Sequence, residues 1–188
     1  MMQVLYIIAW LVSGYLIADL ISGITHWWMD RYGKEEVPIV GPAVVEINTM
    51  HHANPRRMIS RSYWYLSKSA WVFSWGICGI WFLVFDNLPW QMIWVAVVGS
   101  NGNIVHQWTH MFENEKPRIV TWMQKLRIIQ NPAQHATHHT KPEERAYCII
   151  TPWLNPILDK TRFWFRLENI IEYLFGVPPN TRLQDLNN

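Results

Sequence analysis

The stretch Gln134-His135-Ala136-Thr137-His138-His139 gathers three histidines in a chain that is otherwise apolar and rich in tryptophan. If it is helical, His135, His138 and His139 stand at i, i+3 and i+4, so their imidazoles leave one face of the helix. Neutral imidazoles are common ligands of transition metals. The stretch therefore predicts part of a metal site, and a polar loop that happens to hold histidines is the alternative.

The composition indicates a small membrane protein. The chain has 188 residues, half of them apolar, with 13 tryptophans and only 16 % charged residues. This length predicts one domain, residues 1–188. The net charge of +2 is too small to indicate nucleic-acid binding. Two cysteines, Cys78 and Cys148, exclude a disulfide framework and a cysteine-based zinc site.

Three apolar runs are long enough to cross a bilayer as helices, at about 2–28, 63–85 and 90–110. A signal peptide is the competing interpretation of the first run, but no basic residues precede it and no small-residue cleavage site follows, so we expect a transmembrane helix. The stretch Asp86-Asn87-Leu88-Pro89 predicts a tight turn that joins the other two runs as a hairpin. We therefore expect an all-α integral membrane protein with about three transmembrane helices.

The basic residues predict the orientation in the membrane. Every lysine and arginine lies within 31–68 or 116–182. By the positive-inside rule the N-terminus and the 86–89 turn face outward, and the segments 29–62 and 111–188 are cytoplasmic. Two amphipathic patterns, 118–130 and 162–175, predict helices that lie along the membrane interface or pack in a core.

This topology brings every histidine of the chain to the cytoplasmic side. They are His26, His51, His52, His106, His110, His135, His138 and His139. Asp30 follows His26 at i+4 and is a candidate ligand or orienting partner. Eight imidazoles exceed the four ligands of one zinc ion, so the set predicts a dinuclear site. Nitrogen-rich ligation without thiolates favours iron, with copper or zinc as alternatives.

Asp19 lies deeper in the first apolar run. An acidic residue within a span is a candidate functional group. The alternative is a hydrogen bond to another helix, with Asn101 or Asn103 as the expected partner.

Several motifs, in order and at compatible distances, resemble the Kua/CarF-type lipid desaturases, which include plasmanylethanolamine desaturase and the plastid palmitate desaturase. They are Ala18-Asp19, Ser22-Gly23, His26-Trp27, Asp30, Gly33, Pro38-Ile39-Val40-Gly41, His51-His52-x-x-Pro55, His106-x-Trp108-x-His110, His135-x-x-His138-His139, Tyr147-Cys148-Ile149, Thr151-x-Trp153-Leu154-Asn155 and Phe163-Trp164-x-Arg166-Leu167-Glu168. The chain departs from the family pattern at Met50, where plasmanylethanolamine desaturases carry an acidic residue, and at Gln134, where relatives often carry a further histidine.

The resemblance implies a membrane-bound desaturase that uses two Fe ions and O2 to place a double bond in an acyl or alkyl chain of a membrane lipid. Plasmanyl lipids are one candidate substrate, and the external electron donor would be of the cytochrome b5 or ferredoxin type. Two alternatives stay open. One is a histidine-box lipid hydroxylase or oxidase, since hydroxylation shares the first hydrogen abstraction with desaturation. The other is a non-enzymatic metal or haem membrane protein.

Overall fold

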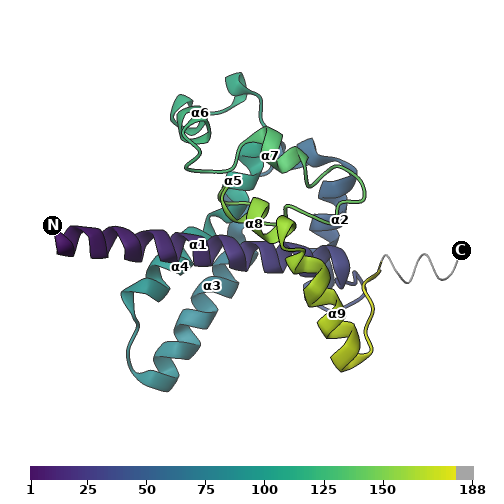
Figure 1. Ribbon diagram of the computed structural model, residues 1–188. Coiled ribbons are helices and arrows are strands. Elements are labelled where there is room, and N and C mark those ends of the chain that lie inside the picture. Colours follow the sequence, from purple (N-terminus) through teal and green to yellow (C-terminus); the bar gives the residue numbers. More distant parts are fainter. Residues whose placement is uncertain (181–188) are drawn as a thin grey trace, which may run out of the picture.

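The computed structural model describes residues 1–180, and within them all regular structure is helical (Figure 1). The prediction of an all-α chain is therefore confirmed. The elements are α1 (Met2–Arg31), the π-helix η1 (Gly41–Val45), α2 (Glu46–Ala53), the 3-10 helix η2 (Pro55–Ser60), α3 (Tyr63–Phe85), α4 (Trp90–Ser100), α5 (Gly102–Thr109), the 3-10 helix η3 (Glu113–Glu115), α6 (Arg118–Lys125), α7 (Pro132–Ala136), α8 (Leu154–Lys160) and α9 (Phe163–Phe175).

The longest helix, α1, leaves its N-terminal part exposed and packs its C-terminal part against the rest of the chain (Figure 1). Gly14 allows α4 to approach closely, because a Cβ at this position would lie 2.5 Å from Cδ1 of Trp94. The Trp94 indole instead lies on α1 and donates a hydrogen bond from Nε1 to the carbonyl of Leu11 at 2.9 Å. This contact joins α1 to the hairpin formed by α3 and α4.

The hairpin begins and ends at residues suited to those positions. Ser62 caps α3 by accepting a hydrogen bond from the backbone N–H of Tyr65 at 3.3 Å. The helix stops at Asp86, whose φ of 51° lies in the left-handed region that aspartate tolerates better than most residues. Within residues 1–180, two helices, α1 and α3, are long and apolar enough to cross a bilayer.

The predicted third span, 90–110, is not one continuous helix. It breaks at Asn101 into α4 and α5. Ser100 and Asn101 each donate a side-chain hydrogen bond to a carbonyl four residues earlier, at 2.6 Å and 2.8 Å. Such bonds compete with the helical ladder, and Gly102 follows as the weakest helix former short of proline. The break redirects α5 and sets the direction of its histidines.

Residues 146–151 form a buried segment that lies against the C-terminal half of α1. Asp19 accepts hydrogen bonds there from the N–H groups of Ile150 (2.9 Å) and Thr151 (3.1 Å), and from the Thr151 hydroxyl (2.6 Å). The expected bond from Asp19 to Asn101 or Asn103 is therefore wrong. The backbone N–H groups of this non-helical segment have no helical partner, so they need an acceptor. The side-chain amides of Asn101 and Asn103 do not depend on Asp19 in this way.

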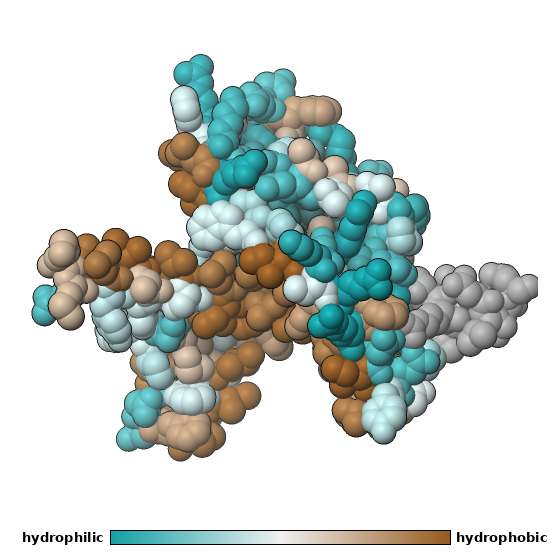
Figure 2. Space-filling model, viewed as in Figure 1, coloured by the Kyte–Doolittle hydropathy of each residue, from teal (hydrophilic) through white to brown (hydrophobic). Residues whose placement is uncertain are grey.

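The two amphipathic helices form, but the first is shorter than predicted. Helix α6 ends at Lys125, and Arg127 takes a left-handed φ of 58°, so 118–130 is not helical throughout. Helix α9 ends at Phe175, the predicted limit, and Gly176 follows it with a left-handed φ of 66°. Figure 2 shows apolar surface along α1 and over the α3–α4 hairpin, and polar surface over the opposite part of the molecule.

Candidate metal centre

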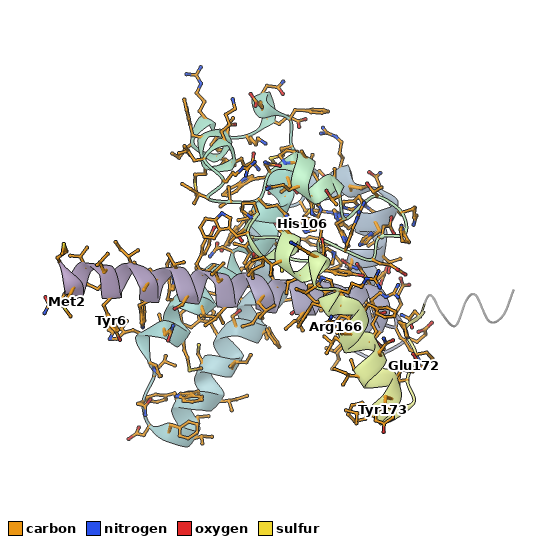
Figure 3. The ribbon with its side chains drawn as sticks, viewed as in Figure 1. Met2, Tyr6, His106, Arg166, Glu172 and Tyr173 are labelled. Carbon is orange, nitrogen blue, oxygen red and sulfur yellow. The ribbon has the colours of Figure 1, made fainter. Side chains whose placement is uncertain are left out.

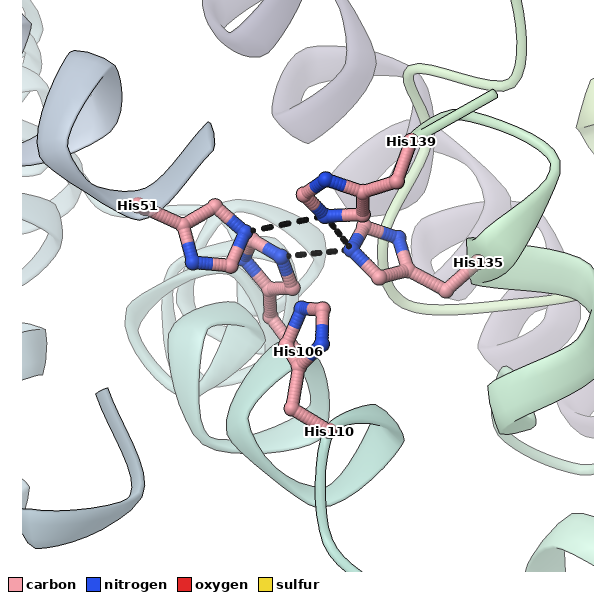
Figure 4. Close-up of side chains that lie close together, drawn as sticks. All are labelled: His51, His106, His110, His135 and His139. Carbon is pink, nitrogen blue, oxygen red and sulfur yellow. Dashed lines mark hydrogen bonds between the residues drawn. The ribbon is translucent and has the colours of Figure 1, made fainter. Parts of the chain in front are cut away.

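Five histidines from four parts of the chain face one another (Figure 4), in the part of the molecule where Figure 3 labels His106. His51 belongs to α2, His106 to α5 and His110 to its C-terminal end, while His135 and His139 come from α7 and the turn after it. The Nε2–Nε2 distances are 2.8 Å for His106 to His135, 3.0 Å for His135 to His139 and 3.1 Å for His51 to His139. We call these residues the five-histidine group.

These short distances do not describe a set of ordinary hydrogen bonds. A ring nitrogen offers either a proton or a lone pair, and Nε2 of His135 and of His139 each contact two others. All three contacts therefore cannot be well-formed hydrogen bonds at once. Around an ion with nitrogen ligands at about 2.1 Å and 90° apart, neighbouring nitrogens would lie about 3.0 Å from each other. The spacing fits donors that share one ion.

A second group lies beside the first and contains a carboxylate. It consists of His26, Asp30, His52 and His138, from α1, α2 and the turn after α7. Nε2 of His52 is 3.1 Å from Oδ1 of Asp30, and Nε2 of His138 is 3.4 Å from Oδ2. Nε2 of His26 lies 3.8 Å from Oδ2. We call these four residues the carboxylate group.

Backbone carbonyls orient two rings of the carboxylate group. The Nδ1–H of His26 donates to the carbonyl of Tyr147 at 3.1 Å, and that of His138 donates to the carbonyl of Arg145 at 2.9 Å. A carbonyl accepts only, so Nδ1 carries the proton and Nε2 keeps its lone pair toward the group. This arrangement is usual for histidines that bind metals.

Several buried polar atoms of the two groups have no hydrogen-bond partner among the described residues. They include Nε2 of His26, Oδ2 of Asp30 and Nε2 of His110. Buried donors and acceptors are rarely left unpaired, and each one left so costs roughly 1–3 kcal/mol. A cation bound in each group would satisfy these atoms, so the residues present fit metal ions.

Burial keeps most of these rings in the neutral form that metals require. It lowers the pKa of His51, His135 and His138 well below the usual value, and that of His139 to about 4. Burial would also lower the pKa of His52, but the hydrogen bond that its imidazole donates to Asp30 raises this pKa above its usual value. Lone pairs are thus available in the five-histidine group near neutral pH.

The two groups together contain all nine side chains that the sequence marked as candidate ligands. The prediction that His135, His138 and His139 leave one face of a helix is wrong. Helix α7 ends at Ala136, and the turn that follows sends His138 to the carboxylate group and His139 to the other. His51 and His52, about 100° apart on α2, are divided in the same way.

Sequence reasoning missed Asn48. Its buried side-chain amide donates to Oδ1 of Asp30, which holds the carboxylate toward the histidines. A signal was present, because Asn48, His51 and His52 stand at i, i+3 and i+4, the same spacing as the three histidines after Gln134. Gln134 itself faces Asn131, and each side chain accepts a hydrogen bond from the other residue's backbone N–H, which forms a capping box.

A large apolar cavity of about 1130 Å³ ends at the two groups. His26, His51 and His106 line it, and its wall continues along α3 from Tyr65 to Trp81. The 16 helical steps from Tyr65 to Trp81 correspond to about 24 Å at a rise of 1.5 Å per residue. Most of the wall is aliphatic or aromatic and comes from α1, α3 and α4. The cavity is shaped for a long apolar molecule with one end beside the histidines.

A histidine-rich candidate metal centre at the end of a long apolar cavity is an arrangement suited to a protein that acts on lipid-like molecules. The chain belongs to the lipid desaturase family, because the model of the lipid desaturase domain matches residues 15–182.

Curated relatives agree with this assignment. The chain is 32 % identical to a probable fatty acid desaturase of Acanthamoeba polyphaga mimivirus, over 92 % of this chain and 86 % of the relative. It is 29 % identical to plasmanylethanolamine desaturase 1 of Mus musculus (92 % and 68 %). It is also 29 % identical to the chloroplastic fatty acid desaturase 4 of Arabidopsis thaliana (90 % and 53 %), so the chain spans about half of that protein. No solved structure matches.

Proposed function

We propose that this protein is a membrane-bound, O2-dependent di-iron lipid desaturase that introduces a double bond into an acyl or alkyl chain of a membrane lipid. The observation that carries the proposal is the position of two adjoining candidate metal groups at the end of a long apolar cavity. Plasmanyl lipids are among the candidate substrates, since plasmanylethanolamine desaturases are relatives at 28–29 % identity.

The donor set supports iron. Five imidazoles in one group, and three imidazoles with Asp30 in the other, leave room for open positions on a six-coordinate ion. No cysteine belongs to either group, which disfavours a structural zinc site of the usual kind. When bound, two iron ions can reductively activate O2 strongly enough to abstract hydrogen from an unactivated C–H bond.

The residues of this chain would position the substrate and protect the reaction. The cavity wall along α1, α3 and α4 would hold the hydrocarbon chain by apolar burial and exclude water. His26, His51 and His106 line the cavity, so a methylene pair in it can lie next to both groups. Asn48 and the carbonyls of Tyr147 and Arg145 would keep the ligands oriented between turnovers.

We place α1 and the α3–α4 hairpin in the bilayer, with the N-terminus and the hairpin turn outside and both metal groups on the cytoplasmic side. The distribution of lysine and arginine supports this orientation. The exposed apolar residues of α6 and α9, such as Trp122 and Leu174, suit helices lying in the membrane interface. An external electron donor of the cytochrome b5 or ferredoxin type would approach from the same side.

The first test measures metal content. Protein purified after iron-replete expression should hold about two irons per chain, as a dinuclear oxygen-activating site requires. One iron or none, with zinc in its place, would overturn the proposal. A Soret band would instead indicate a haem protein.

The second test is lipid analysis of an expressing host supplied with a working donor, comparing the wild type with His110→Ala and with Arg118→Gln. Arg118 is an exposed residue of α6 that belongs to neither group. A new double bond or vinyl ether should appear with the wild type and with Arg118→Gln and be absent with His110→Ala. A hydroxylated product would assign the chain to the alternative class of hydroxylases.

A further inference from the structure

The charged residues in the wall of the cavity are of one sign. Arg57 and Arg61 line it, and no lysine, aspartate or glutamate of the described residues does. Both arginines stand in or just after η2, immediately before α3 begins at Tyr63. They belong to the end of the cavity where His51 lies, since the opposite end follows α3 to Trp81 and the hairpin turn.

Neither guanidinium forms an ion pair with a carboxylate among residues 1–180. Nη1 of Arg57 contacts Sδ of Met50 at 3.3 Å, and the guanidinium of Arg61 lies over the ring of Tyr65, 4.8 Å from its centroid. Two other arginines that stand near helix ends in the described residues do form ion pairs. Arg31 binds Glu168 and Glu144, and Arg56 binds Glu115.

A third cation, Lys68, adds to the positive charge of Arg57 and Arg61. Nζ of Lys68 lies 5.5 Å from the centroid of the same Tyr65 ring. Cations gathered at one end of an apolar cavity, without a carboxylate to neutralise them, favour a ligand that carries its own negative charge. Guanidinium groups match the geometry of phosphate oxygens, which they bind through two parallel N–H bonds.

The position along the chain fits the depth of a phospholipid phosphate. In the proposed orientation α3 enters the bilayer at its N-terminal end, so Arg57 and Arg61 lie where the headgroups begin. Exposed aromatic side chains of Tyr63 and Trp64 stand at the same level, as is typical of the interface. A lipid tail in the cavity would bring its phosphate to these arginines.

We propose that Arg57 and Arg61 are specificity-determining residues that bind the phosphate of the lipid in the cavity and select a net anionic headgroup over one that carries an ammonium group. The proposal rests on the proposed function, because it takes the occupant of the cavity to be a phospholipid. An ammonium group would meet two guanidinium groups and no carboxylate there, so it would be repelled as well as unpaired. Among the candidate plasmanyl substrates, one with an anionic headgroup would therefore bind better than plasmanylethanolamine.

The test measures lipid retention and needs neither iron nor an electron donor. The full chain is equilibrated in mixed micelles with equal amounts of phosphatidylglycerol, phosphatidylethanolamine and diacylglycerol that carry identical acyl chains. After gel filtration, the bound lipids are counted by mass spectrometry. We expect about a tenfold excess of phosphatidylglycerol over phosphatidylethanolamine, which corresponds to one charge-assisted hydrogen bond. Diacylglycerol should be retained least.

Variants show which residues cause the preference for phosphatidylglycerol. In the double variant Arg57→Gln with Arg61→Gln the ratio should fall to about one, and each single variant should lie between. Arg118→Gln should keep the wild-type ratio, because this exposed arginine of α6 does not line the cavity. Ser74→Trp, which puts an indole into the cavity wall, should reduce the retention of all three lipids.

Two results of this test would overturn the proposal: equal retention of the two phospholipids by the wild type, or a preference that survives the double variant. A third would be that inorganic phosphate displaces bound phosphatidylglycerol as well as free phosphatidylglycerol does, because the arginines would then bind free phosphate and not a lipid headgroup. The proposed function is judged separately, by product analysis. A chain that retains anionic lipid but forms no double bond would refute the desaturase and leave the arginine site standing. A desaturase without headgroup preference would refute the site alone.

Discussion

The five-histidine group and the carboxylate group lie side by side but differ in charge. One offers only neutral imidazoles, whereas the other includes Asp30, which would cancel part of the charge of a bound cation. Both draw on the same short segments, since α2 gives His51 to one and His52 to the other, and the turn after α7 divides His138 and His139 in the same way. Two ions bound here would therefore have different ligand types, but the same two short segments would position the ligands of both.

The largest expected effect comes from removing one ligand of either group. His106→Ala should leave the carboxylate group intact, and Asp30→Asn should leave the five-histidine group intact. Each should lower iron from about two per chain to about one and reduce desaturation at least 100-fold, more than the roughly 10- to 100-fold effect of an orienting residue. Metal analysis and the Mössbauer spectrum of the remaining iron measure this. If the remaining iron gave the same spectrum in both variants, the two groups would not be chemically distinct.

A smaller effect should come from Asn48, which holds Asp30 without belonging to either group. Asn48→Ala should lower the activity or the metal affinity roughly 10- to 100-fold and affect the carboxylate group first. Asn48→Asp should be worse than Asn48→Ala, because it replaces a donor to Asp30 by a second negative charge next to it. Iron content at graded chelator concentrations separates the variants. The reverse order would show that Asn48 does not position Asp30 through its N–H donor.

The residues that meet at the site were predictable from sequence because histidine and aspartate are metal ligands that stand out in an apolar chain. Histidine is rare in apolar chains, and the i, i+4 spacing of His26 to Asp30 and of His106 to His110 survives in any helix that contains it. The division of the nine residues was not predictable in full. It depends on where α7 ends, and helix ends are set by local side-chain bonds that periodicity does not report.

The fold shows the same limit. The lengths of α1 and α3 follow from apolar composition, so they were predicted closely. The break at Asn101 and the partners of Asp19 depend on individual hydrogen bonds between segments that lie far apart in the sequence. Asp19 was recognised as unusual from its place in an apolar run, but the N–H groups that it pairs with belong to residues 150 and 151.

The smallest effect, and the one that tests the structural link between the groups, should come from Gln134. Its capping box with Asn131 starts α7, the helix that positions His135 and leads into His138 and His139. Gln134→Ala should cost about 1 kcal/mol, since one reciprocal cap bond is lost. The apparent melting temperature should fall by roughly 2–4 °C for a chain of this size.

Gln134→Glu is the matched control, because glutamate completes the same capping box. It should keep the melting temperature and both irons. Since α7 serves both groups, Gln134→Ala should lower the affinity for both ions equally in a chelator titration. Asn48→Ala should instead release one ion before the other. Preferential loss from the five-histidine group would mean that the turn after Ala136 holds His138 independently of the cap, and the two groups would then be separate in structure as well as in chemistry.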